Sequence, residues 1–136
     1  MEHYLVDTNL IVDILRGYTD SAIFIDSLSD LNISVISWYE LIEGVENTKQ
    51  QKTLEKYLSD YQIFHITESI SKKALDLVLR FNLSNNLQHD DALIASTCLE
   101  YGLVLATRNI KHFKSIDGLQ VVAPYNEILP NSPVRA

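Results

Sequence analysis

Three carboxylates stand where a folded chain could gather them into one site. Asp7 directly follows a first apolar run, Glu40 comes shortly after a second, and Asp91 opens a third. The carboxyl ends of parallel strands meet at one edge of a sheet, which is where open α/β folds place their ligands. Carboxylate oxygens bind hard divalent cations, and crowded carboxylates raise one another's pKa unless a cation lies among them. The pattern therefore predicts a metal site built from residues far apart in the sequence.

Each acid also has an ordinary structural explanation. Asp7 fits the N-cap of the helix expected after it. Ser37 and Glu40 have the spacing of a capping box, in which Glu40 reaches back to the Ser37 amide. Asp90 and Asp91 suit the N-terminus of a helix through its dipole. Each of these explanations could account for one acid without a metal. The acids would still lie near one another, because the ends of parallel strands share an edge of the sheet.

The rest of the chain alternates between strand-like and helix-like segments. Short apolar runs rich in Val, Ile, Leu and Tyr predict strands at 3–6, 32–36, 61–66, 103–107 and 119–123. The stretches between them predict helices at 9–16, 20–29, 37–46, 48–59, 68–82 and 90–101. This alternation indicates a parallel sheet with helices on both faces. We expect one α/β domain over residues 1–129 and a flexible tail at 130–136.

Composition narrows the class of function. A net charge of −7 over 136 residues argues against a broad phosphate-binding surface and so against a DNA-binding module. It does not argue against a nuclease, because metal ions can supply positive charge locally. No apolar run approaches the ~20 residues of a membrane span, and the first residues lack the charged-then-apolar pattern and cleavage site of a leader, so neither a span nor a leader is expected. The single cysteine, Cys98, falls in an apolar helical stretch and is expected to be buried. The sequence predicts a cytoplasmic protein without membrane contact.

Four phrases of the sequence resemble a known family, and they occur in that family's order. They are Leu5-Val6-Asp7-Thr8-Asn9, Ser37-Trp38-Tyr39-Glu40-Leu41-Ile42-Glu43-Gly44, Asp91-Ala92-Leu93-Ile94-Ala95 and Thr107-Arg108-Asn109-Ile110-Lys111-His112-Phe113. Together they resemble the PIN domain and, more narrowly, the VapC toxins of type II toxin–antitoxin systems. The resemblance extends from Tyr4 to about Val122. One phrase alone would be weak, whereas four in register are specific.

The resemblance implies an Mg²⁺- or Mn²⁺-dependent endoribonuclease that acts as a toxin. It also implies a PIN-like three-layer α/β/α fold with a five-stranded parallel sheet. Asp7, Glu40 and Asp91 match the family's acidic positions, as catalytic residues and metal ligands. The positions that match supporting polar residues are Thr8, Asn9, Thr107 and Asn109. A water made more acidic by the metal would hydrolyse the RNA phosphodiester bond.

The chain departs from the family pattern in one segment. Several relatives have a further acid between Asn109 and His112, and this chain has none. We therefore expect one firmly held metal and a weaker second one, with Asp90 and Glu43 as candidates at the edge of the site. The departure leaves an alternative open: a PIN-like RNA- or protein-binding module without cleavage activity. A phosphotransferase with Asp7 as nucleophile is disfavoured, because the second aspartate expected two residues later is missing.

The same resemblance implies three partners: an RNA substrate, a cognate antitoxin protein and a second copy of the chain in a homodimer. An acidic site on a chain of net charge −7 should attract a basic segment, and an arginine can bridge two carboxylates. Several apolar side chains exceed the needs of one small core and are candidates to seat a partner. They are Ile23, Phe24, Trp38, Tyr57 and Tyr61.

Overall fold

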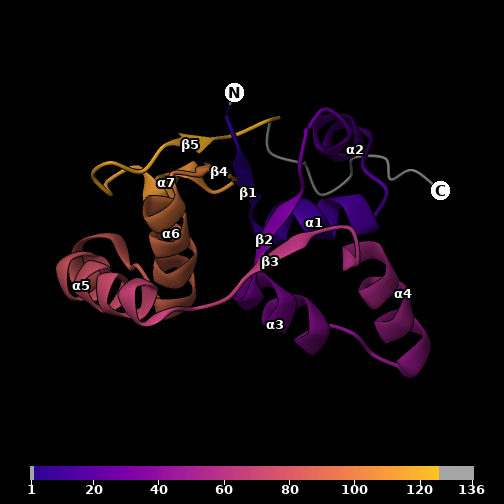
Figure 1. The fold of residues 1–136 in the computed structure, drawn as a ribbon, viewed down its shortest axis with the longest axis horizontal. Coiled ribbons are helices and arrows are strands. Elements are labelled where there is room, and N and C mark those ends of the chain that lie inside the picture. Colours follow the sequence, from indigo (N-terminus) through magenta and orange to yellow (C-terminus); the bar gives the residue numbers. More distant parts are fainter. Residues whose placement is uncertain (1, 126–136) are drawn as a thin grey trace.

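Short parallel strands form the centre of the computed structural model, which describes residues 2–125 (Figure 1). The strands are β1 (Tyr4–Val6), β2 (Asn32–Ser34), β3 (Gln62–Phe64), β4 (Val104–Ala106) and β5 (Val121–Val122). Their backbone ladders join them in the orders β1-β4-β5 and β2-β3, and every pairing is parallel. All five strands were predicted, each within a few residues of its observed ends. The parallel α/β architecture is therefore confirmed.

The prediction of a single five-stranded sheet is wrong, because the strands form one sheet of three and one of two. The break falls between β1 and β2, which lie beside each other. There the Asn32 side chain donates from Nδ2 to the Tyr4 carbonyl oxygen at 3.0 Å. Asn32 is only 2% exposed. A buried side-chain amide thus bridges the two strands where a continuous sheet would have a backbone ladder.

Helices connect the strands in the predicted order. They are α1 (Thr8–Leu15), α2 (Thr19–Asp26), α3 (Val35–Glu43), α4 (Thr48–Leu58), α5 (Glu68–Asn85), α6 (His89–Tyr101) and α7 (Ile110–Phe113). The one-turn helix α7 was not predicted, since four residues are too few to show a hydrophobic period. Helix α5 runs three residues beyond its predicted end and stops at Asn86, whose φ of 54° is left-handed. Gly102, with φ of 66°, ends α6 and turns the chain into β4.

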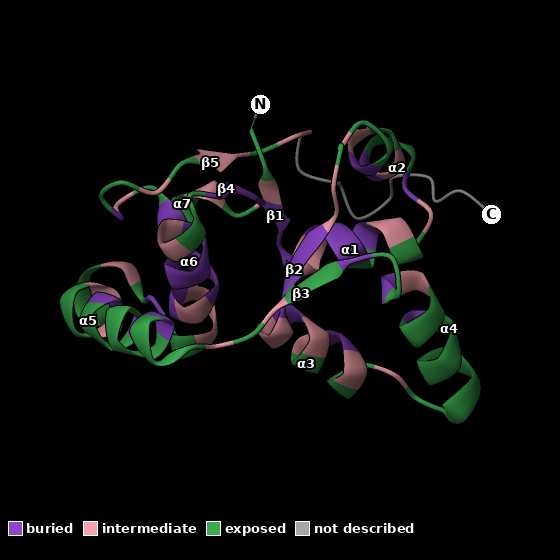
Figure 2. Cartoon of the chain, viewed as in Figure 1, coloured by how far each residue is buried: buried purple, intermediate pink, exposed green. Residues whose placement is uncertain are grey.

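Two hydrophobic clusters occupy opposite faces of the strands. Leu5 packs with residues of α5 and α6, whereas its neighbour Val6 packs with residues of α1, α3 and α4. Leu105 and Ala106 on β4 divide in the same way. Successive side chains of a strand point to opposite faces, so this alternation places helices on both sides of the strands. The buried residues accordingly follow β1, β2 and β4 and the inward faces of the helices (Figure 2).

Two further expectations concern the chain as a whole. Cys98 is buried, as predicted. In the described part of the chain, no helix is long and apolar enough to cross a membrane. The tail predicted at 130–136 lies outside the described residues.

Candidate functional site

Asp7 is a buried carboxylate at the end of β1, only 6% exposed. It is the N-cap of α1, and its Oδ1 accepts a hydrogen bond from the Thr8 amide at 2.8 Å. Its Oδ2 accepts from the Thr107 hydroxyl at 2.7 Å. Burial raises the Asp7 pKa to about 6, against the opposing effect of these hydrogen bonds, and the charges of Asp91 and Asp90 raise it further. Capping is thus a real role of Asp7, but it does not account for the neighbouring acids.

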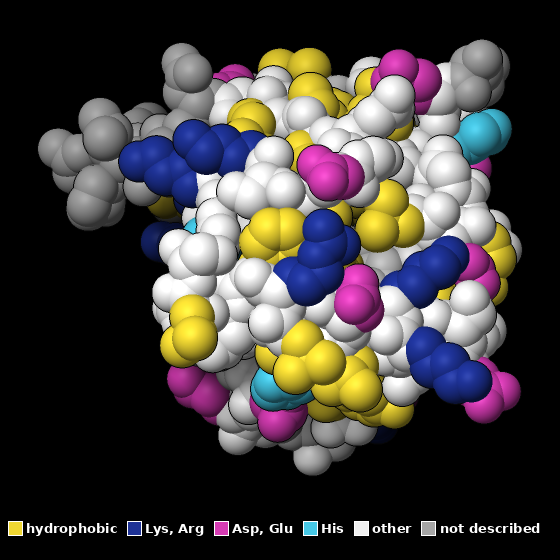
Figure 3. Space-filling view, turned by 90° about the vertical axis from the view of Figure 1, so that its left-hand side faces the viewer, with side chains coloured by type: hydrophobic (Ala, Val, Ile, Leu, Met, Phe, Trp, Pro, Cys, Tyr) yellow, Lys and Arg dark blue, Asp and Glu magenta, His cyan; other side chains and the backbone are white. Residues whose placement is uncertain are grey.

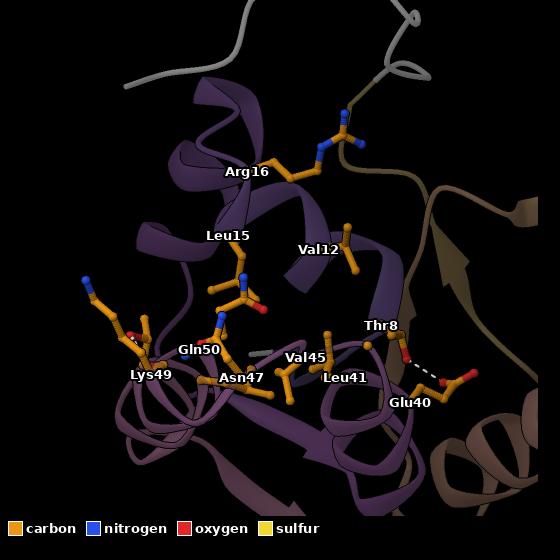
Figure 4. Close-up of a pocket in the computed structure, with 13 residues that line it drawn as sticks. Thr8, Val12, Leu15, Arg16, Glu40, Leu41, Val45, Asn47, Lys49 and Gln50 are labelled. Atoms are coloured by element: carbon orange, nitrogen blue, oxygen red, sulfur yellow. Dashed lines mark hydrogen bonds between the residues drawn. The ribbon is translucent and has the colours of Figure 1, made fainter.

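Glu40 is held toward α1 by Thr8. The Thr8 hydroxyl oxygen lies 2.7 Å from both Glu40 Oε1 and Ser37 Oγ, so it can donate to the carboxylate while accepting from the serine (Figure 4). The proposed capping box of Ser37 and Glu40 is wrong, because α3 begins two residues earlier, at Val35. Its N-cap is Ser34, whose Oγ accepts from the Ile36 amide at 3.0 Å.

Asp90 lies closer to the other acids than an edge position suggests. Burial raises the Glu40 pKa to about 7, the Thr8 hydrogen bond opposes this, and a hydrogen bond with Asp90 and the charges of Asp90 and Asp7 raise it further. Asp90 therefore lies within hydrogen-bonding reach of Glu40 and disfavours its ionised form. Glu43, the other edge candidate, is exposed at the last residue of α3, and among the described residues it makes no hydrogen bond with these acids.

Asp91 lies in the first turn of α6, half-buried, beside His112 of α7. Burial raises the Asp91 pKa, and the Asp90 charge adds to this. His112 lowers it, with Nδ1 3.2 Å from Asp91 Oδ2. Asp90 Oδ1 accepts from the Asp91 amide at 2.9 Å. Both acids thus have the helix N-terminal position that the dipole explanation required, and they also face other carboxylates.

Thr107 connects the remaining predicted residues. Its buried hydroxyl donates to Asp7 and accepts from Asn9 Nδ2 at 3.2 Å and from the Asn109 amide at 3.0 Å. The Asn109 side chain itself is exposed. Asn9 Oδ1 is 3.4 Å from the amide nitrogen of Arg108, so Asn9 joins α1 to the loop after β4 through both ends of its amide. This network fixes Asp7 against that loop.

The donor set fits a small divalent cation. The carboxylates of Asp7, Glu40 and Asp91 all have raised pKa values to which the charge of Asp90 contributes, and such groups are stabilised as anions by a cation among them. Among the described residues, no three acidic, cysteine or histidine side chains converge tightly enough to form a ready-made cage. Mg²⁺ does not need one, because it is commonly bound by one or two carboxylates and retains several waters.

Comparison with known proteins identifies the family of this chain. A model of the PIN domain matches residues 4–119, most of the chain. The chain belongs to the PIN-domain family. Ribonuclease VapC10 of Mycobacterium tuberculosis is 32% identical to it over 120 residues, covering 85% of this chain and 90% of that protein. Ribonuclease VapC19 of the same organism is 31% identical over 121 residues and covers 85% and 96%.

Solved structures agree with this PIN-domain assignment. A toxin–antitoxin complex from Klebsiella pneumoniae contains a chain that is 30% identical, with a TM-score of 0.78. The alignment covers 91% of this PIN domain and 99% of that chain.

Two features of this PIN domain were missed by the sequence analysis. The first is His112, which contacts Asp91 from the segment in which the expected further acid is missing. The missing acid was the only sign in the sequence that another side chain of this segment could contact the site. The second feature is an ion pair between Asp13, 1% exposed, and Arg108, whose Nε lies 2.7 Å from Asp13 Oδ2. The Tyr125 hydroxyl donates to the same oxygen at 2.8 Å. No local pattern reveals a pair 95 residues apart.

Proposed function

We propose that this PIN domain is an Mg²⁺- or Mn²⁺-dependent endoribonuclease that acts as the toxin of a toxin–antitoxin pair. The observation that carries the proposal is the group of neighbouring acids in which Asp7, Glu40 and Asp91 have raised pKa values, with the charge of Asp90 contributing to each. Relatives about one-third identical over most of the chain are named ribonucleases, which supports RNA as the substrate. The chain is a VapC homologue, and its structural relatives include toxin–antitoxin complexes.

The residues divide the work of hydrolysis as follows. Asp7, Glu40 and Asp91 are the proposed metal ligands, with Asp90 as the acid that hydrogen-bonds to Glu40. Thr107 orients Asp7 and Thr8 orients Glu40 through hydrogen bonds of 2.7 Å. A divalent cation bound there supplies Lewis acidity toward water and the scissile phosphate. His112 lowers the pKa of Asp91 through its contact with Oδ2 and so favours the ionised, metal-binding form.

Cleavage of transfer RNA in the presence of Mn²⁺ tests this proposal. The wild-type chain should cut the RNA, and either EDTA or Asp7→Asn should abolish cutting, because each removes the cation or one of its charged ligands. Asp76→Asn is the matched control, since Asp76 is an exposed aspartate of α5 that pairs with Arg80. Activity that survives EDTA would place the chemistry elsewhere. RNA binding without any cleavage would favour the non-cleaving binding module.

The proposal extends to an antitoxin and a homodimer. Of the apolar residues predicted to seat a partner, Tyr61 is buried, Phe24, Trp38 and Tyr57 are partly buried in the core, and only Ile23 is largely exposed. The larger exposed apolar surface lies on α5, among charged side chains (Figure 3). It consists of Leu75, Leu79 and Leu83, which are 61%, 76% and 100% exposed.

These three leucines recur every fourth residue and so share one face of α5. We propose that a second copy of the chain packs on this face. Light scattering should give a dimer for the wild type and a monomer for Leu79→Glu, while Ile23→Glu remains dimeric. A dimer that survives Leu79→Glu, or dissociates with Ile23→Glu, would rule out this face.

A further inference from the structure

A groove of about 720 Å³ adjoins the acidic residues. It runs between α1 on one side and α3 and α4 on the other (Figure 4). Thr8 and Glu40 line one end of it, and they are the two residues joined by the 2.7 Å hydrogen bond described above. Whatever occupies the groove therefore lies directly beside the proposed cleavage site.

The groove carries positive charge in a protein whose net charge is −7. Arg16 lines it from the end of α1 and Lys49 from the first turn of α4. Among the residues that the structure describes, no acid forms an ion pair with either of them. Lys52 and Lys56 follow Lys49 at three and seven residues along α4 and so continue the same face of the helix. This basic edge complements a ligand that carries regularly spaced negative charges.

The floor of the groove is apolar. Val12 and Leu15 of α1, which are 36% and 45% exposed, face Leu41, Val45 and Leu54. An apolar floor of this kind can contact the flat faces of unstacked bases.

Two amides at the rim add hydrogen-bond donors. Asn47 Oδ1 accepts from the Gln50 amide at 2.9 Å, and Gln50 Oε1 accepts from the Glu46 amide at 2.8 Å. Because both side-chain oxygens are engaged by the backbone, each side chain presents its NH₂ group as a donor. Such donors can hydrogen-bond to the edges of bases.

We propose that this groove binds single-stranded RNA next to the scissile phosphate, with phosphates on Arg16 and Lys49 and a base against Val12 and Leu15. The inference rests on the proposed ribonuclease function and extends it by assigning the path of the substrate. An acidic peptide is the other ligand with matching charge. RNA is favoured because the groove opens at Glu40, where the reacting phosphate must lie.

The experiment compares two double variants with the same change in charge. Arg16→Gln/Lys49→Gln removes the groove cations, and Lys72→Gln/Arg80→Gln removes a lysine and an arginine from the exposed surface of α5. Binding of a short fluorescein-labelled single-stranded RNA is measured by anisotropy in EDTA at several salt concentrations. Cleavage of the same RNA with Mn²⁺ then gives KM and kcat.

The groove variant should bind the RNA about tenfold more weakly, the loss expected for two exposed charge pairs. Its KM should rise while kcat stays within about twofold, because neither side chain belongs to the acidic site. The slope of log K against log salt should fall by about 1.4, since each phosphate contact of a single strand contributes about 0.7. The α5 variant should bind the RNA like the wild type.

A second pair of variants tests the apolar floor of the groove. Val12→Glu places a negative charge in the groove and should weaken RNA binding, whereas Ile23→Glu makes the same change on α2 and should not. Melting temperatures of all variants establish that they are folded.

A groove variant with wild-type RNA affinity overturns the inference, and so does one that loses affinity for a labelled acidic peptide but not for RNA. The proposed function stands in both cases if the wild type still cleaves RNA. A wild type that binds RNA through the groove without cutting it overturns the nuclease and leaves the groove assignment intact.

Discussion

The stability of the metal-free Asp7→Asn variant, measured relative to the wild type, should be higher at neutral pH than at acidic pH. Asp7 is an acid whose pKa is raised by folding, from 3.8 to about 6. Below pH ~3 it is protonated in both the folded and the unfolded chain, so it has no effect on stability there. Between pH ~4 and about 6, the unfolded state has lost this proton while the folded state still retains it. The free energy of unfolding therefore falls over this window.

The size of the effect follows from the shift. Each pKa unit corresponds to about 1.4 kcal/mol, so ionised Asp7 costs the folded state about 3 kcal/mol above pH ~7. Asparagine removes this cost. It also leaves an amide NH₂ against Thr107 Oγ1, which already accepts two hydrogen bonds. That loss, about 1–3 kcal/mol, does not depend on pH and cancels when two pH values are compared.

Urea unfolding in EDTA, followed by circular dichroism between pH 4 and 8, measures this difference. The stability of Asp7→Asn relative to wild type should rise by about 3 kcal/mol across the range. Asp76→Asn should show no such trend, because its side chain is 67% exposed. Mn²⁺ should reverse the order at neutral pH by stabilising only the wild type. A relative stability that is flat with pH would refute the assignment of Asp7 as a buried, charge-crowded carboxylate.

Three further predictions follow from the contacts of the site. Glu40→Gln should abolish RNA cleavage while changing the melting temperature little, because Glu40 has no capping role in α3; a variant that still cleaves RNA would remove Glu40 from the site. Asp13→Ala should lower the free energy of unfolding by about 3–5 kcal/mol in urea titrations by leaving Arg108 unpaired, whereas Asp13→Leu/Arg108→Met should recover most of it. An equal loss in the double variant would contradict this. His112→Ala should weaken Mn²⁺ binding in calorimetry about tenfold, since Asp91 then loses the neighbour that lowers its pKa; unchanged affinity would mean that the contact has no effect on the ligand.

The order of the elements and the junction positions of the acids could be predicted from the sequence. Asp7 and Asp91 flank strongly apolar runs, and strand ends of a parallel sheet meet at one edge whatever the details of packing. The helix start before Glu40 could not be predicted in the same way. Ser34 and Ser37 are both good N-caps. The choice between them depends on the Thr8 hydroxyl of α1, which forms a hydrogen bond with the Ser37 hydroxyl.

Long-range contacts explain the other differences. The single sheet fails because the Asn32 amide reaches the Tyr4 carbonyl, a contact between residues 28 positions apart. Asp13 looked like an ordinary polar residue of α1 because its partner, Arg108, lies on the far side of the sequence. Such contacts are set by the fold as a whole and have no local signature.

The pairing of β1 with β4 determines when the site can form during synthesis. Among the described strands, β1 has its ladder with β4 alone, and the Thr107 hydroxyl that orients Asp7 is 100 residues away in the sequence. A ribosome-bound chain that ends before β4 therefore has no partner for β1 and no donor for Asp7 Oδ2. Domains with contacts of such long range fold only after most of the chain is available. The acidic cluster of this toxin homologue thus assembles only after β4 has been synthesised, which delays the appearance of the proposed active site on the growing polypeptide.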